Sequence, residues 1–436
     1  MAAGSESGIP GSQTDFGGLR HAVPRAVHRP PLTFPSMVLA AGRPVALRGA
    51  GHSCDGQTVT DGDLLVTYAE DGAVEQIRDL GDGRFEVPAG MNWYDLERHL
   101  NRQGRSVPVL TDHLRVSVGG TLSVGGIGVG SVRHGMQVDS VERIQLIDGT
   151  GVSRWCSRTE HSELFRFALG GLGTAGLIER AVLRTERYRR YTHVHRVGHA
   201  GAADVVEHAE QVALRDDVDS YRAMMRRNRW TSETGWRADG PRRSDGSGSE
   251  DGLRTCADLP LAGRHNRVGL RPPASGTVHL WTDYVVPAGA LGPMIEAVER
   301  QRRRAPLDRV STMVLILLVR RPAGAVPFAF APAAAAPVSI GVGVYCTADR
   351  NVDDIGAIRG VLRELLEQCC ELGGRPYLYG VNDLDDDLAG RLYGGDLDIL
   401  AQLRSTHRLG HVNSRLPLAL LAERRGLASR DLPVAR

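Results

Sequence analysis

Glycine is concentrated in one short stretch of the chain, and few structures can accommodate such a stretch. Six glycines fall within residues 119–130. Glycine loses more conformational entropy on folding than any other residue, so this cluster is unfavourable in an ordinary core element. It is favourable where backbone lies against a flat or anionic ligand. A flexible linker fits poorly, because apolar residues are interleaved with the glycines: Val118, Leu122, Val124, Ile127 and Val129. We therefore expect a strand and turn that face a ligand.

A second segment of small residues, 48–57, follows the predicted strand Pro44–Leu47 and reads Arg-Gly-Ala-Gly-His-Ser-Cys-Asp-Gly-Gln. Consecutive small residues let backbone N–H groups converge on one point, the geometry that holds a phosphate or pyrophosphate. His52 lies inside this turn, where a bound ligand would contact it. The alternative is a tight turn with an exposed histidine. A serine nucleophile elbow is excluded, because Asp55 stands where that motif requires glycine.

A third segment, Leu169–Ile178, contains a formal GxGxxG pattern. A dinucleotide-binding fingerprint should follow a strand and open a helix. Here a helix-like stretch, Glu163–Ala168, comes first, and a strand-like stretch, Leu177–Thr185, comes after. The pattern is therefore a false match to that fingerprint.

Composition excludes several classes of function. The chain has 436 residues, enough for two or three domains, and a formal net charge of +2, too balanced for a nucleic-acid-binding protein. It contains no lysine, which excludes a pyridoxal-phosphate Schiff base and a Walker-type phosphate loop. No CxxC pair is present, and we expect no metal site. Because the sequence has neither a leader-like start nor 18 consecutive apolar residues, we expect a cytoplasmic protein without a membrane partner.

The distribution of apolar residues predicts an α+β fold. Residues 1–14 are small and polar and are expected to be a disordered tail. Short apolar runs at close spacing predict strands, and amphipathic stretches predict helices. The predicted strands include Val45–Leu47, Leu64–Val66, Phe85–Val87, Ile144–Ile147, Thr277–Val286 and Met313–Arg320. The predicted helices are Tyr94–Asn101, Ala202–Leu214, Ile355–Leu372 and Gly395–Thr406, and the predicted loops are Arg237–Gly252 and Ala323–Pro337.

Several histidines and tryptophans are candidate functional residues. His193, His195 and His199 form an HxHx₃H pattern without a nearby carboxylate, which favours surface histidines over a metal site. His113 and His134 are either acid–base groups or polar surface residues. Trp230 and Trp236 are expected to pack in the interior.

Taken together, these segments resemble the vanillyl-alcohol-oxidase family of flavoproteins, which carry a PCMH-type FAD-binding domain, and within it the cytokinin-dehydrogenase-like branch. The resemblance covers about Asp15–Glu186. Residues 48–57 match the family's R-G-x-G-H-S-x-x-G-Q loop, and Val118–Ile127 match V-G-G-T-L-S-x-x-G-I. Further matches are Asp15–Gly18, Thr111-Asp112, Arg133-His134-Gly135 and Leu169–Ile178, and weaker ones are Arg375–Leu378, Ala401–Arg404 and Asn413. The abundance of arginine, alanine and glycine also resembles proteins of GC-rich genomes, such as those of actinobacteria.

This resemblance implies a two-domain α+β architecture with a PCMH-type FAD-binding domain and a second α+β substrate domain. The implied boundaries are 15–188 for the FAD-binding domain and 189–385 for the substrate domain, with 386–436 returning to the FAD-binding domain. It also implies FAD held covalently through His52. No cysteine lies among Leu114–Ser117, where the bicovalent branch has one, so a single link is expected.

The resemblance further implies the site residues. Asp112 would be the general base, and Tyr377 and Asn413 would approach the isoalloxazine. The predicted cofactor-binding residues are Arg48, Gly49, Ala50, Gly51, His52, Ser53, Gln57, Asp112, Ser117, Gly120, Ser123, Ile127, Gly173, Ile178 and Asn413, and the predicted catalytic residues are Asp112 and Tyr377. A base at a partly desolvated site would have a raised pKa.

The implied activity is a dehydrogenase or oxidase that takes a hydride from a small molecule. We expect a mid-sized, largely uncharged specialised metabolite as substrate, and molecular oxygen or another acceptor for the electrons. The alternatives are a flavin-dependent cyclase or isomerase without net redox change, and a catalytically inactive binding protein.

Overall fold

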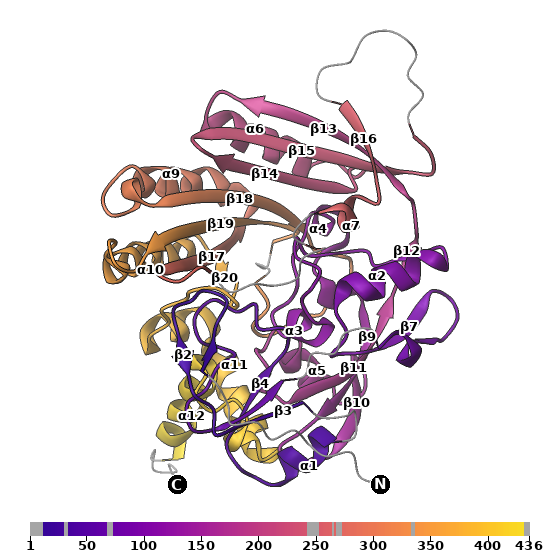
Figure 1. Ribbon diagram of the computed structural model, residues 1–436, viewed down its shortest axis with the longest axis vertical. Coiled ribbons are helices and arrows are strands. Elements are labelled where there is room, and N and C mark those ends of the chain that lie inside the picture. The colour runs from indigo at the N-terminus through magenta and orange to yellow at the C-terminus, as the bar shows by residue number, and fades with distance from the viewer. Residues whose placement is uncertain are drawn as a thin grey trace, which may run out of the picture.

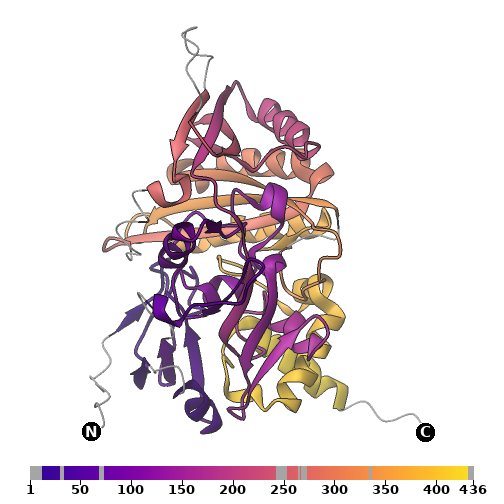
Figure 2. The ribbon, with the colours of Figure 1, turned by 90° about the vertical axis from the view of Figure 1, so that its right-hand side faces the viewer.

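The computed structural model describes residues 12–29, 34–67, 73–241, 253–263, 266, 273–332 and 336–430. These residues form two stacked parts (Figure 1 and Figure 2). One part is a large sheet with helices on one face. The other combines smaller sheets and helices from both ends of the chain, so that the early and late segments lie side by side (Figure 1). All three glycine-rich segments belong to this second part.

The N-terminal region supplies most of the second part. Its strands are β1 (Gln13–Thr14), β2 (His21–Ala22), β3 (Ala26–His28), β4 (Val45–Arg48), β5 (Leu64–Thr67), β6 (Arg78–Asp79), β7 (Arg84–Pro88), β8 (Arg105–Ser106), β9 (Val141–Ile147), β10 (Ser153–Ser157), β11 (Leu177–Arg184) and β12 (Glu186–Arg187). They form a parallel sheet β3-β5-β4, an antiparallel sheet β10-β9-β11-β7-β6, and the pairs β1-β2 and β12-β8.

Short helices connect these strands: α1 (Phe34–Ala40), α2 (Trp93–Arg102), α3 (Val118–Leu122), α4 (Ser131–His134) and α5 (Ser162–Ala168). α2 shows why the sequence folds locally in this way. The Asn92 side chain caps its first turn by accepting from the Asp95 N–H at 2.9 Å. Its apolar residues Trp93, Leu96 and Leu100 recur at helical spacing and are buried.

The large sheet is built from residues 191–376. Its strands are β13 (Tyr191–His199), β14 (Ser220–Arg226), β15 (Arg229–Ala238), β16 (Leu253–Ala257), β17 (Thr277–Pro287), β18 (Ser311–Arg320), β19 (Val338–Asp349) and β20 (Arg375–Pro376). They run in the order β16-β13-β15-β14-β18-β19-β17-β20, and the paired neighbours are antiparallel. The helices of this region are α6 (Ala202–Ala213), α7 (Leu259–Ala262), α9 (Leu291–Arg302) and α10 (Ile355–Glu371).

The two faces of this sheet have different neighbours. In β18, Val314, Ile316 and Leu318 are fully buried, whereas the alternate residues Met313, Leu315 and Leu317 line a cavity on the other face. Successive side chains of a strand point to opposite faces, so this alternation separates a core face from a ligand-facing one. α6, α9 and α10 lie along the core face (Figure 1).

The C-terminal region returns to the N-terminal sheets. α11 (Asp386–Thr406) and α12 (Pro417–Arg430) pack against each other, and Val412 forms a parallel bridge with Val45 of β4. Arg404 is buried, and its guanidinium donates to the carbonyls of Thr174 and Val412. This contact joins α11 to the third glycine-rich segment.

The structure confirms the predicted strands and helices named above, except the strand expected in the glycine-rich segment 119–130, and corrects their limits. β1 includes Gln13 and Thr14, so the expected disordered tail is wrong at these two residues, which pair with Ala22 and His21; residues 1–11 lie outside the described residues. The helix expected from Gly395 begins at Asp386, where the Asp385 side chain caps it, and continues past a non-helical Gly394. Arg237 and Ala238 belong to β15 rather than to a loop, and 242–252 lie outside the described residues.

The structure also bears on several local interpretations. Helix α5 precedes the GxGxxG pattern and strand β11 follows it. This order confirms that the pattern is not a dinucleotide-binding fingerprint. Within the described residues, no group of three or more His, Cys, Asp or Glu side chains could hold a metal ion. Trp230 is buried, as expected. No helix in the described part of the chain is long and apolar enough to cross a membrane.

Candidate active site

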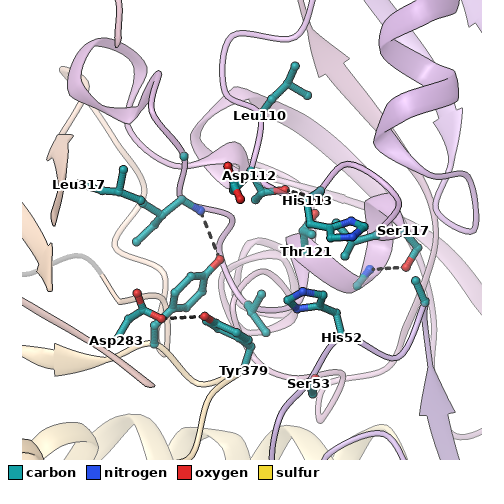
Figure 3. A pocket seen from close by; sticks show the side chains of 18 of the residues that line it. His52, Ser53, Leu110, Asp112, His113, Ser117, Thr121, Asp283, Leu317 and Tyr379 are labelled. Atoms are coloured by element: carbon teal, nitrogen blue, oxygen red, sulfur yellow. Dashed lines mark hydrogen bonds between the residues drawn. The ribbon is translucent and has the colours of Figure 1, made fainter. Parts of the chain in front are cut away.

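One large cavity of about 930 Å³ lies between the sheet and the glycine-rich segments. A cavity of this size is typical of cofactor and substrate sites. All sixteen residues that the sequence predicts for the site line it, although they come from distant parts of the chain. Figure 3 shows part of this wall, with His52, Asp112 and Asp283 facing a common space. Their roles in binding and catalysis stay predictions.

The 48–57 loop presents unused backbone donors to the cavity. In the described part of the chain, none of the five N–H groups from Gly49 to Ser53 donates to another protein group. Gly51 has a φ of +78°, which turns the backbone in a way that other residues rarely allow. At Gly49 an added Cβ would lie 2.3 Å from Ser117 Oγ, so only glycine lets the two segments approach. The loop is therefore a nest of donors suited to an anion.

The side chain of Arg48 supports this loop from within. Its guanidinium donates to the Thr58 carbonyl at 3.1 Å and lies against Gly51. Burial lowers the pKa of Arg48 from its usual value, and the nearby Asp15 opposes this change. Asp15 itself accepts from the backbone N–H groups of Leu19, Arg20 and Gly56. It therefore holds residues 15–20 against the 48–57 loop.

His52 lies in an aromatic and desolvated environment. Its ring stacks on Phe16 with 4.2 Å between centroids, and the ring of His113 lies 5.6 Å away. Burial, with a smaller contribution from His113, lowers the pKa of His52 to about 3. The imidazole is therefore neutral at physiological pH, and a neutral ring nitrogen keeps the lone pair that a covalent attachment requires.

The glycine-rich segment 119–130 begins as a helix, and the expected strand is wrong there. Ser117 accepts from the Gly120 N–H through its Oγ and caps α3, so its side chain stabilises a helical first turn despite two glycines. Ser123 ends this helix, with its Oγ donating to the Gly119 carbonyl at 2.7 Å. Beyond it, the Gly126 and Ile127 N–H groups donate to the Tyr377 hydroxyl at 3.0 and 3.2 Å. Tyr377 thus fixes the turn.

Two side chains that the sequence predicts to contact the cofactor, Gln57 and Asn413, form most of their hydrogen bonds with other protein groups. The Gln57 amide donates to the carbonyls of residues 378–380 and accepts from the Asp55 N–H, so it positions a neighbouring loop. Asn413 accepts from the Leu47 N–H at 2.8 Å and donates to the carbonyls of Leu172 and Gly173. Both of its amide N–H groups are occupied, and Asn413 joins three segments of the wall.

Asp112 lies open to the cavity. Its side chain is 72% exposed, and its Oδ1 lies 3.9 Å from the Arg222 guanidinium. The expectation that it would be partly desolvated is therefore wrong for the protein by itself. The loop beside Asp112 is held in place by a hydrogen bond, in which the Leu114 N–H donates to Asn266 Oδ1 at 2.7 Å. The backbone that carries Asp112 is held while its carboxylate stays accessible.

The sequence reasoning missed a polar group on the sheet. Asp283 of β17 accepts from the Tyr345 and Tyr379 hydroxyls, both at 2.8 Å, and all three residues line the cavity. Burial raises the pKa of Asp283 to about 6, although both tyrosine hydrogen bonds lower it. An aspartate inside the apolar strand 277–287 was the signal that could have identified it, because a charge in a buried strand requires a partner.

The residues present fit FAD. The free N–H groups of the 48–57 loop suit a pyrophosphate, and the neutral His52 suits a covalent link. The apolar and glycine residues Ile127, Gly173 and Ile178 offer flat surface to the cofactor's rings. The donor set contains anion-binding backbone rather than metal ligands, which agrees with a nucleotide cofactor.

Comparison with known proteins also supports an FAD site. The sequence pattern of the FAD binding domain family matches residues 36–157. An uncharacterized oxidoreductase, ORF5 of the fasciation locus in Rhodococcoides fascians, is 37% identical over 175 residues, covering 39% of this chain and 39% of that protein. Cytokinin dehydrogenase 10 of Oryza sativa subsp. japonica is 37% identical over 190 residues, covering 40% of this chain and 34% of the plant protein. These matches span under two fifths of either relative's own length.

Proposed function

We propose that this chain is an FAD-linked oxidoreductase acting on a small organic molecule, because residues 36–157 match the FAD binding domain family and the glycine-rich segments resemble flavoproteins of the vanillyl-alcohol-oxidase type. The observation that supports this most is the 48–57 loop, which combines unused N–H donors with a neutral histidine at one cavity wall. The matched family segment, 36–157, includes this loop. The oxidised flavin, when bound, supplies the acceptor for a hydride from the substrate.

The chain's own residues then have distinct roles in this proposal. The N–H groups of Gly49–Ser53 hold the pyrophosphate, and His52 carries the covalent link. Tyr377 keeps the Gly126–Ile127 turn in place beside the cofactor site. Asp112 takes the proton from a substrate C–H, N–H or O–H group, because its accessible carboxylate faces the cavity from the FAD-binding side.

The substrate is not inherited from the relatives in this proposal. The matched family segment ends at residue 157, before the large sheet begins at Tyr191, and the sheet supplies much of the remaining cavity wall. We therefore assign no cytokinin to the site, and a specialised metabolite is the proposed class. The electrons pass to molecular oxygen or to another acceptor.

Anaerobic spectroscopy tests this function. Purified protein should be yellow, and mixing it without oxygen with amines, alcohols and isoprenoid adenines should bleach the oxidised-flavin band for at least one compound. A colourless protein that takes up no FAD contradicts the proposal. If product forms while the flavin stays oxidised throughout, the chain is instead a cyclase or isomerase. Rapid bleaching by an isoprenoid adenine contradicts the exclusion of cytokinins.

A further inference from the structure

Asp283 is a carboxylate without a cationic partner on the cavity wall. Each of its oxygens accepts one tyrosine hydroxyl, and a carboxylate has about four acceptor positions, so capacity remains on both oxygens. Among the described residues, no Arg or His nitrogen forms an ion pair with it, and no cation contributes to its pKa. A buried anion without a counter-charge is costly, so its presence at a ligand site calls for a ligand that offsets the cost.

The other carboxylates that line the cavity already lie beside arginines. Arg222 donates to Glu233 at 2.9 Å, and Arg237 forms an ion pair with Glu186. Asp112 lies near Arg222. Asp283 is therefore the place on the described wall where a positive charge from a ligand meets an uncompensated negative one.

Aromatic rings surround this carboxylate. The ring of Trp281 lies 5.0 Å from that of Tyr345, and the ring of Tyr379 lies 4.8 Å from that of Tyr377 and 6.0 Å from His52. All of these rings line the cavity. Faces of Trp and Tyr attract cations, most strongly where water is excluded. A carboxylate among such rings is the arrangement that recognises an ammonium group.

Gly343 on the neighbouring strand makes room for the group. Strand pairing sets Gly343 opposite Asp283, and an added Cβ there would lie 2.6 Å from Asp283 Oδ1 and 2.7 Å from the Tyr345 hydroxyl. Any larger residue would displace the carboxylate or its partner. The sheet is thus shaped around this cluster.

We propose that Asp283, Trp281, Tyr345 and Tyr379 bind a protonated amine of the substrate. This rests on the proposed function in taking the cavity as the substrate site, and it places the amine on the sheet side, across from Asp112 (Figure 3). The substrate would then be a molecule with an ammonium group at one end and an oxidisable carbon at the other. This departs from the uncharged substrate that the sequence suggested.

The test compares two probes that differ in charge and little in shape. 2-Phenylethylamine and 2-phenylethanol are titrated into the purified holoprotein, and binding is followed by calorimetry, which requires no turnover. The amine should bind at least about 10-fold more tightly than the alcohol, a difference of about 1.4 kcal/mol. Equal binding, or no binding of the amine, overturns the proposal.

Two variants identify which carboxylate causes the preference for the amine over the alcohol. In Asp283→Asn, which keeps the size of the side chain and removes its charge, the two probes should bind within about 2-fold of each other. Asp112→Asn is the matched control, because it removes another carboxylate of the cavity and should keep the preference. A preference that survives in Asp283→Asn and disappears in Asp112→Asn assigns the ammonium to Asp112 and overturns the proposal.

A pH series provides a second measurement that needs no variant. Around Asp283, burial raises the pKa values of Cys54, Tyr284, Tyr345, Tyr377 and Tyr379 and lowers that of His52, so all six are neutral between pH 5 and 8. The amine stays protonated throughout this range. Its affinity should therefore fall as the pH drops through about 6 and Asp283 becomes neutral. A flat profile contradicts the proposal.

These results are separable from those on the function itself. A protein that binds the amine selectively but whose flavin no compound reduces fails the proposed activity. A protein whose flavin is reduced readily by some substrate but that shows no preference for the amine fails only this inference.

Discussion

His52 illustrates how the surroundings of a single side chain decide its chemistry. The ring lies between Phe16 and His113, and burial keeps it neutral down to a pH of about 3. A protonated imidazole could not attack an electrophilic carbon, because its lone pair would be occupied. The desolvated position therefore suits the covalent attachment that we propose for His52.

We expect wild-type protein to keep its flavin when precipitated with acid. His52→Ala removes the nucleophilic nitrogen, so the variant should release all its flavin into the supernatant or bind none. Absorbance of the pellet and supernatant distinguishes these cases. Complete release from the wild-type protein would contradict the covalent link.

Asp112 offers the matching test of proton transfer. Asp112→Asn keeps the shape of the side chain and loses its ability to accept a proton, so flavin reduction by substrate should slow by roughly 10²–10⁴-fold. Folding and flavin content should not change, because the side chain is largely exposed. Rapid-mixing absorbance measures the rate.

Asp82→Asn is the control, since Asp82 is an exposed carboxylate outside this cavity. Its reduction rate should equal that of the wild type. If Asp112→Asn also reduces its flavin at the wild-type rate, another group is the base. His113, which lines the cavity, would be tested next, whereas His134 lies outside the cavity beside Glu186.

At the scale of elements, the C-terminal return depends on one residue between α11 and α12. Asn413 has a φ of +49°, and its amide bonds to Leu47 of β4 and to the carbonyls of Leu172 and Gly173. Asparagine tolerates the left-handed backbone better than other non-glycine residues. One residue thus provides both the turn and the three hydrogen bonds.

Two substitutions separate these contributions. Asn413→Gly loses the hydrogen bonds and keeps the turn, so we expect the free energy of unfolding to fall by about 1–3 kcal/mol. Asn413→Ala also forces alanine into the left-handed region, which should cost roughly 1 kcal/mol more. Denaturant titration of both variants measures the two values. If the alanine variant is as stable as the wild type, the hydrogen bonds of Asn413 do not stabilise the return of the C-terminal segment.

The sequence predicts elements well where the determinants are local. Alternating or helically spaced apolar residues identified β18, β17 and α10, and contiguous motifs identified the 48–57 loop. The helix α3 was missed, because its start depends on capping by Ser117 rather than on residue propensity. Asp283, Tyr345 and Tyr379 were missed for a different reason. The register of β17 with β19 brings Asp283 and Tyr345 together although they are 62 residues apart in the sequence. No local pattern encodes that register.

At the scale of the whole molecule, an ion-pair network joins the 48–57 loop to the helices of the large sheet. Arg359 of α10 donates to both carboxylate oxygens of Asp55, at 2.8 and 2.9 Å, and also to Asp383. Burial lowers the pKa of Arg359, but the two carboxylates outweigh it and raise the pKa overall. The network fixes the 48–57 loop relative to the large sheet.

Arg359→Gln should therefore weaken the whole assembly. We expect a loss of about 1–2 kcal/mol, reduced from the value for a fully buried pair because the groups are partly solvated. Thermal unfolding of the holoprotein should show a lower Tm and lower flavin content. Arg363→Gln is the control, since Arg363 of the same helix bonds to Glu367, Asp385 and the Asp383 carbonyl and does not touch the 48–57 loop. A variant of Arg359 no less stable than the Arg363 control would contradict the network's role.

The hydrogen bonds between the 48–57 loop and residues 378–380 have a consequence for how the protein is made. The Cys54 N–H donates to the Tyr379 carbonyl, and Gln57 donates to three carbonyls of that turn, so one wall is assembled from segments more than 320 residues apart. A nascent chain that has emerged only as far as the large sheet has its nucleotide loop but not the loop's brace. We therefore expect the cofactor to be bound late in biosynthesis, and a chain on a ribosome stalled before Tyr379 should not yet hold FAD.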